Sequence, residues 1–210
     1  MKLWLELVIE KDRAVMYKAK CRSFVNNFAK IIAACLGARV TGGYYDFSST
    51  TVVDVNGNAV TVYGQWFEGA SYGYGGGTSP FGLFAPGGDD SFGVVVGSGS
   101  TPVSTTDYRL ASKILHGAGA GQLDYGTHVV TSSFGSSSSY IDVARSFTNR
   151  SGGDVTVRET GLIARNLWGG LGGQTAVDVK FLIARDVLPT PITVKALGSL
   201  TVRYRISLSL

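Results

Sequence analysis

One stretch decides the fold class: Ser199-Leu-Thr-Val-Arg-Tyr-Arg-Ile-Ser-Leu-Ser-Leu210. Its side chains alternate, with large apolar residues at the even-numbered positions from Leu200 to Leu210 and polar residues at the positions between them. A period of two is typical of a β-strand, because successive side chains point to opposite faces of the sheet. The stretch therefore predicts a strand with one buried face and one solvated face.

Three earlier segments repeat this pattern. They are Tyr140 to Asn149, Asp154 to Arg165 and Lys180 to Leu188, and Ser151-Gly-Gly153 supplies a turn between the first two. Half-buried antiparallel strands build sandwiches and barrels, which commonly serve binding or assembly through their surfaces. We expect an all-β protein, mainly an antiparallel β-sandwich, with an N-terminal β-hairpin and one amphipathic helix.

The N-terminal part has its own pattern. Residues 2–10 and 14–20 read as the two strands of a hairpin, and apolar residues then recur at helical spacing from Phe24 to Leu36, with Ser23 as the N-cap and Gly37 as the stop. We expect residues 1–38 to form this hairpin and helix, packed on the main domain or on a neighbouring subunit. Residues 39–210 then form the sandwich domain.

The middle of the chain alternates strands and loops. Asn56-Gly57 lies between two alternating segments, which is the strongest short signal for a hairpin. Residues 69–90 carry aromatic side chains on a glycine-rich backbone and read as a long contact loop. Residues 91–98 and 122–134 read as strands, and residues 107–114 as one or two helical turns.

Composition narrows the function classes. Charged residues make up only 16% of the chain, against about 25% in typical globular proteins, which favours shared surface and therefore assembly. The net charge of +4 is scattered, so we expect no nucleic-acid partner. No segment approaches the roughly 20 apolar residues of a membrane helix, so we expect no membrane insertion. Residues 1–13 carry charges among their apolar residues and contain no small-residue cleavage site, so we also expect no secretion signal. The two cysteines, Cys21 and Cys35, allow at most one disulfide bridge, so we expect no disulfide framework.

The residues that carry chemistry form no recognisable motif. His116 and His128 have aspartates such as Asp107 and Asp124 near them in sequence, but no Gly-x-Ser-x-Gly sets a nucleophile on an elbow. The glycine-rich runs lack the context of a phosphate-binding loop. We expect no enzyme, no cofactor and no metal.

Several blocks, taken in order, resemble a known family. They are Ser23-Phe-Val-Asn-Asn-Phe28, Gly93-Val-Val-Val-Gly-Ser-Gly99, His116-Gly-Ala-Gly-Ala-Gly-Gln-Leu123, Arg145-Ser-Phe-Thr-Asn149, Val155-Thr-Val-Arg-Glu-Thr-Gly-Leu162, Phe181-Leu-Ile-Ala-Arg-Asp-Val187 and Leu200-Thr-Val-Arg-Tyr-Arg-Ile206. The succession resembles a family of β-rich structural proteins encoded by tailed phages and related prokaryotic viruses. The resemblance implies a virion component present in many copies, with its place in the head, neck or tail left open.

We therefore expect a non-enzymatic virion structural protein, made in the host cytoplasm, whose partners are further copies of itself and other virion proteins. A receptor- or glycan-binding fibre or decoration module that contacts the host surface is the first alternative, and a surface filament subunit is the second. The candidate subunit contacts are Phe24, Phe28, Ile31, Tyr72, Tyr74, Phe81 and Phe84. The candidate receptor contacts are Trp66, Tyr72, Tyr74 and Trp168.

Overall fold

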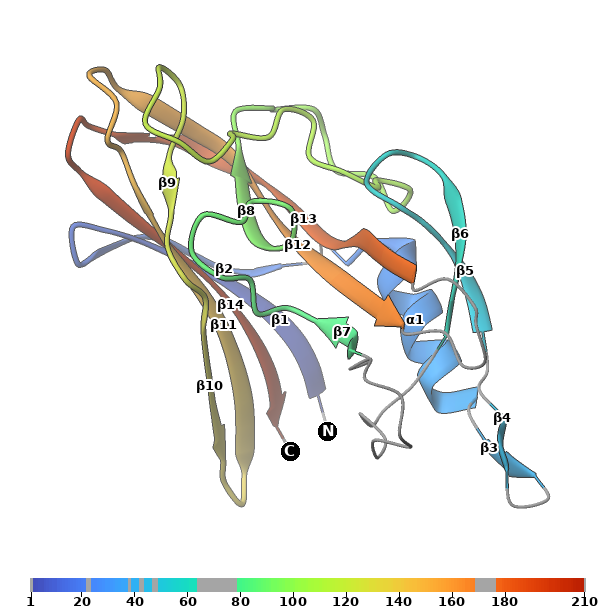
Figure 1. Ribbon diagram of the computed structural model, residues 1–210. Helices are drawn as coiled ribbons and strands as arrows, with labels where there is room; N and C mark the ends of the chain where they lie inside the picture. The colour runs from blue at the N-terminus through green and yellow to red at the C-terminus, as the bar shows by residue number, and fades with distance from the viewer. Residues whose placement is uncertain are drawn as a thin grey trace.

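A computed structural model shows an all-β protein built from antiparallel sheets with one helix, as the alternating segments predict (Figure 1). The structure describes residues 2–21, 24–37, 39–41, 44–46, 49–63, 79–168 and 177–209. Within these residues, no helix has the length and apolar character needed to span a membrane.

The larger sheet has six strands in the order β10-β11-β14-β1-β2, with β9 also paired to β11. All of its pairs are antiparallel. The closing strand β14 lies in the middle of the sheet and pairs with β1 along its whole length. The strands are β1 (Lys2–Lys11), β2 (Ala14–Cys21), β9 (Asp124–Tyr125), β10 (Val129–Phe134), β11 (Ser138–Thr148) and β14 (Ser199–Ser209).

The smaller sheet has four strands arranged around β12 (Val155–Trp168). Strand β13 (Val177–Val194) pairs along one side of β12, and β7 (Ser79–Gly82) and β8 (Gly93–Gly97) pair along the other. Strand β13 continues through Pro189 and Pro191, beyond the expected end at Leu188. Proline is tolerated there because β13 lies at the edge of its sheet.

A short hairpin, β3 (Arg39–Thr41) with β4 (Tyr44–Asp46), follows the helix α1 (Asn26–Gly37) in the chain, and a second hairpin, β5 (Ser49–Val53) with β6 (Ala59–Tyr63), packs against that helix. Asn27 joins the helix to β5 and to β13, because its side-chain amide donates to the carbonyls of Val53 at 2.8 Å and Leu182 at 3.2 Å. The turn of the second hairpin places Gly57 at φ 91°, a conformation that favours glycine.

The core lies between the two sheets. Leu200, Val202 and Tyr204 of β14 are fully buried, whereas Thr201, Arg203 and Arg205 are partly exposed, which confirms the predicted alternation for residues 200–205. The burial pattern changes after that point: Ile206 is partly exposed and Ser207 is only 7% exposed. Apolar side chains of the smaller sheet face them, including Val155, Val157, Leu162, Phe181, Leu188 and Val194. The two sheets therefore form a β-sandwich.

The N-terminal hairpin belongs to this sandwich. Strand β1 lies between β14 and β2, so the hairpin pairs with the chain's own sheet. Its inward side chains Leu5, Leu7 and Ile9 are each at most 1% exposed. The hairpin is thus an integral part of the larger sheet, and the helix that follows packs against β5 and β13.

Three expectations for the middle of the chain are wrong in part. Residues 107–114 form no helical turn but run beside β8, where Ser98 N–H donates to Ser112 O and Ile114 N–H to Val96 O. Residues 122–134 form two strands, because the chain breaks between β9 and β10 where the imidazole of His128 turns into the core. Residues 79–82 of the expected long loop form β7, while its first part, residues 69–78, lies outside the described residues.

Candidate functional site

Two long loops follow β7 and β8, and each is fixed to the sandwich by a buried arginine. Residues 83–92 connect β7 to β8, and residues 98–123 connect β8 to β9. Arg145 and Arg185, which hold these loops, are 1% and 2% exposed. Charged side chains are rarely buried so completely unless partners surround them.

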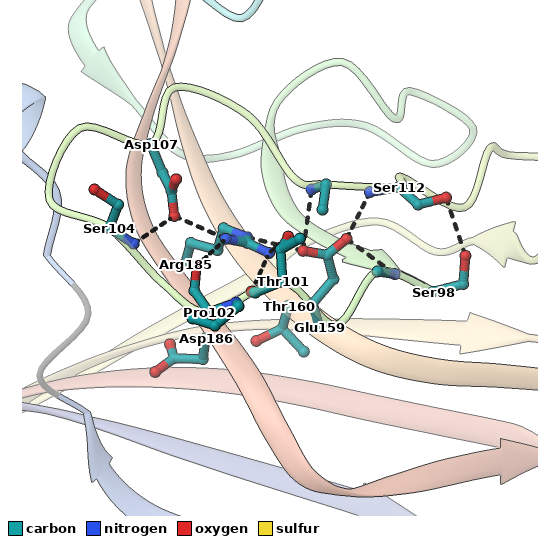
Figure 2. A network of polar contacts seen from close by, with 12 residues as sticks. Ser98, Thr101, Pro102, Ser104, Asp107, Ser112, Glu159, Thr160, Arg185 and Asp186 are labelled. Atoms are coloured by element: carbon teal, nitrogen blue, oxygen red, sulfur yellow. Dashed lines mark hydrogen bonds and ion pairs between the residues drawn. The ribbon is translucent and has the colours of Figure 1, made fainter.

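Arg185 of β13 lies at the centre of the polar network in Figure 2. Its Nε donates to Glu159 at 2.8 Å and its Nη1 to Asp107 at 2.8 Å. Its Nη2 donates to the carbonyl of Thr101 at 3.0 Å. Burial acts to lower the pKa of Arg185, but the hydrogen bonds to Asp107 and Glu159 outweigh it and raise that pKa above its ordinary value. The guanidinium is therefore a permanent cation that ties the 98–112 segment to β13.

Glu159 completes this network from β12. Its side chain is fully buried and accepts backbone N–H groups from Gly99 at 3.1 Å, Ala111 at 3.1 Å and Ser112 at 2.7 Å. Together with Arg185, these donors occupy both carboxylate oxygens. A carboxylate with this many donors positions a loop and has no free acceptor with which to bind a substrate.

Arg145 of β11 binds the other loop through backbone carbonyls. Its guanidinium donates to Pro86 at 2.9 Å, Asp89 at 2.6 Å and Gly126 at 2.7 Å, and it lies 4.7 Å from the centre of the Tyr125 ring. Burial lowers the pKa of Arg145, while Tyr125 and Asp89 act in the opposite direction. The cation therefore donates to four carbonyls between residues 86 and 94, since Phe92 and Val94 each accept from its Nη1 at 3.4 Å in addition to the bonds to Pro86 and Asp89.

His128 connects the same loop to β8. Its Nε2 accepts the N–H of Val94 at 2.6 Å, which assigns the proton to Nδ1, and Nδ1 then donates to the carbonyl of Ala85 at 3.1 Å. Burial, helped by the charge of Arg145, lowers the pKa of His128 to about 4. The imidazole is neutral at pH 7 and serves as a connector.

His116 also has a connecting role. Its Nδ1 accepts the N–H of Tyr125 at 3.2 Å, and it lies 3.5 Å from Asp124, which pairs with Arg150 at 2.7 Å. No serine hydroxyl hydrogen-bonds either histidine in the described part of the chain. Every buried side-chain nitrogen or oxygen of the described residues has a hydrogen-bond partner, so these groups are committed to holding the structure together.

An open hollow lies between the Asn56 turn and the 109–113 segment, with a volume of about 460 Å³. It contains three cations, Arg109, Lys113 and Lys180. Lys113 pairs with Asp90 at 2.9 Å and Lys180 with Asp178 at 3.1 Å. Asp178 also pairs with Arg165 at 2.8 Å, so Lys180 shares its carboxylate with a second cation, whereas among the described residues of this hollow Lys113 is the one cation paired with Asp90.

The structure places the predicted contact residues in different environments. Phe24 and Phe28 stack at 3.9 Å and pack against the core, and Phe84 is 57% exposed. Ile31 is 0% exposed, so the expectation that it contacts a neighbouring subunit needs correction: the helix turns it into the chain's own core. Phe81 belongs to β7, and Trp168 is the last residue of β12. The other predicted contacts, Trp66, Tyr72 and Tyr74, lie outside the described residues.

Sequence reasoning missed the exposed apolar surface on the β10–β11 hairpin. Val129, Val130 and Phe134 of β10 are 57%, 47% and 76% exposed, and Ile141 of β11 is 39% exposed. The hairpin projects beyond the smaller sheet at the lower left of Figure 1. The signal in the sequence was Val129-Val-Thr-Ser-Ser-Phe134, a strand without a single charge.

The outer face of the same sheet is charged. Asp142 of β11 accepts two hydrogen bonds of 2.7 Å from Arg205 of β14, and Arg203 lies 3.4 Å from Glu10 of β1. The bonds to Asp142 raise the pKa of Arg205. Charges therefore cover the centre of this face, while the β10 edge is neutral.

Comparisons with protein-family models, curated proteins and solved structures found no match to this chain.

Proposed function

We propose that the chain is a non-enzymatic structural protein of a viral particle, and that it acts by assembling with copies of itself and with other virion proteins. Two kinds of surface would carry this role. One is the exposed apolar hairpin of β10 and β11, and the other is the loop side of the sandwich, where Phe84, Val103 and Leu115 are exposed.

One contrast carries the proposal. The buried ionisable groups form hydrogen bonds that fix the loops to the sandwich; these groups are Arg145, Arg185, Glu159 and His128. Large apolar side chains, in contrast, remain exposed on β10 and β11. Clustered exposed apolar residues commonly mark surfaces that contact another protein. A rigid framework with apolar contact surfaces suits assembly better than it suits catalysis.

Two sequence observations add support. Charged residues are only 16% of the chain, which fits a protein that shares much of its surface with neighbours. The ordered blocks from Ser23-Phe-Val-Asn-Asn-Phe28 to Leu200-Thr-Val-Arg-Tyr-Arg-Ile206 resemble structural proteins of tailed phages and related viruses. Five of these blocks, from residue 93 onward, include parts of β8, β11, β12, β13 and β14, so the resemblance covers the sandwich itself.

Light scattering on the purified chain, combined with negative-stain imaging, tests the assembly. We expect a concentration-dependent multimer of defined symmetry, such as a ring, a trimer or a filament. A monomer at every concentration would count against self-assembly. It would favour instead a decoration or receptor-binding module that binds the particle as a single copy.

A further inference from the structure

We infer that the β10 edge is a self-association site, where β10 of one copy pairs antiparallel with β10 of a second copy and joins the two larger sheets into one. The inference rests on the proposed assembly function and specifies its contact. The observations that carry it are the free edge, its lack of charge and the apolar side chains on one of its faces.

Strand β10 is an open edge. Among the described strands it pairs only with β11, so alternate backbone N–H and C=O groups along Val129–Phe134 point away from the sheet. All six of its residues are exposed. An edge of this kind is a template for the addition of another strand.

The two edges of the larger sheet differ in protection. Strand β2, at the opposite edge, carries the exposed Lys18 and Lys20, and lysine on an edge strand is a common guard against pairing with another chain. Strand β10 contains neither a charge nor a proline. The β2 edge therefore carries charges that oppose pairing with another strand, and the β10 edge carries none.

A second copy fits this edge because a symmetric pairing brings each residue close to its own counterpart. Any charge on β10 would then face an identical charge, and directly opposed like charges are destabilising. A strand made only of Val, Thr, Ser and Phe avoids that repulsion. A strand from an unrelated partner would impose no such condition.

The exposed apolar side chains favour one register. Val130 lies opposite Val143, a residue of the core face that is 2% exposed, so Val130, Ser132 and Phe134 all belong to that face by the period of two. The two-fold axis preserves faces, so each residue pairs with one of the same parity. With the axis at Ser132, Val130 of each copy lies opposite Phe134 of the other.

This register also covers the neighbouring strand. Ile141 lies opposite Ser132 in the β10–β11 pair and opposite Ile206 in the β11–β14 pair, and it is 39% exposed. Phe134 is 76% exposed in the single chain. Pairing at Ser132 would gather these apolar groups from both copies on one continuous face.

The test exchanges charges at the two-fold axis. Ser132→Lys and Ser132→Glu each place two like charges opposite one another only if Ser132 faces its own counterpart. Sedimentation velocity over a concentration series should show that either variant alone weakens the β10-mediated dimer at least about tenfold. A mixture of the two variants should restore it, because the mixed dimer pairs Lys with Glu. Ser132 is exposed, so neither change disturbs the core.

Met16→Lys on β2 is the matched control, because Met16 is 54% exposed on the opposite edge, and it should associate like the wild type.

Three results would overturn the inference. The first is unchanged association of both Ser132 variants, and the second is equal dissociation by Met16→Lys, which would indicate head-to-tail pairing of β10 with β2. Both leave self-assembly standing, whereas the third, a monomeric wild type, removes self-assembly as well.

Discussion

Removing the guanidinium of Arg185 should destabilise the fold strongly. Arg185→Met leaves Glu159, whose side chain is fully buried, and Asp107 without their cation. Breaking a buried ion pair by removing one partner costs about 3–5 kcal/mol, because the remaining charge stays buried. Met fills much of the same volume, so the loss reflects charge and hydrogen bonds more than a cavity.

Arg165→Met is the matched control. Arg165 lies on the neighbouring strand β12 and pairs with Asp178 at 2.8 Å, but these side chains are 34% and 38% exposed. Solvent-exposed pairs contribute about 0.2–1 kcal/mol. Equilibrium unfolding in urea at pH 7 should therefore separate the two variants by at least about 2 kcal/mol in the free energy of unfolding.

Hydrogen exchange gives a second measurement on the same variants. Arg185 accounts for the bonds to Thr101 and Asp107, so Arg185→Met should raise the exchange of amides in residues 99–112 while the central strands β1 and β14 stay protected. Equal unfolding free energies for the two variants, with no change in exchange of the 99–112 segment, would refute the reasoning.

Three further predictions concern single groups in the core. The imidazole of His128 takes up a proton near the ordinary His pKa of 6.5 in the unfolded chain but only near pH 4 in the folded chain. The free energy of unfolding should therefore fall by about 3 kcal/mol as pH drops from 6.5 to 4. Urea titrations should show that His128→Gln removes this share of the pH dependence. Gly93 has φ +79°, and a Cβ added there would overlap the imidazole of His128, so Gly93→Ala should lower the free energy of unfolding by about 2–5 kcal/mol. Gly121→Ala is its control, because Gly121 has φ +75° but no atom within 4 Å of an added Cβ, and it should cost about 1–2 kcal/mol. Equal melting temperatures for the two variants would contradict this prediction. Tyr204→Phe removes the hydroxyl that lies 2.6 Å from Thr160 Oγ1 between the two sheets. Thermal unfolding should then show that the free energy of unfolding falls by about 1–3 kcal/mol. An unchanged free energy of unfolding would mean that this contact does not join the sheets.

The strands of the sandwich could be predicted because each carries its own period. The alternation in β14 and the Asn56-Gly57 turn are local signals, and the structure contains both elements. The segment at 107–114 was misleading because Leu110 and Ile114 have helix-like spacing, yet Leu110 is buried next to Gly161 of β12 and Ile114 is buried beside β8. Tertiary contacts outweighed local preference there.

The buried polar network could not be predicted from sequence. The sequence places Glu159 and Arg185 on separate strands, but only the packed loop shows that they form a buried pair and share it with Asp107. The carbonyl ligands of Arg145 carry no sequence signal, because every residue has a carbonyl group. The neutral edge at β10 was visible in the sequence, but its position at the end of the sheet depends on strand order.

The proposed role as a virion structural protein is tested most directly by quantitative mass spectrometry of gradient-purified particles, produced by the host that carries this gene. A virion structural protein should be present at a copy number comparable with the other structural proteins and should stay with the particles through salt washes. Absence of the chain from the particles, with the whole amount left in the host lysate, would contradict the account.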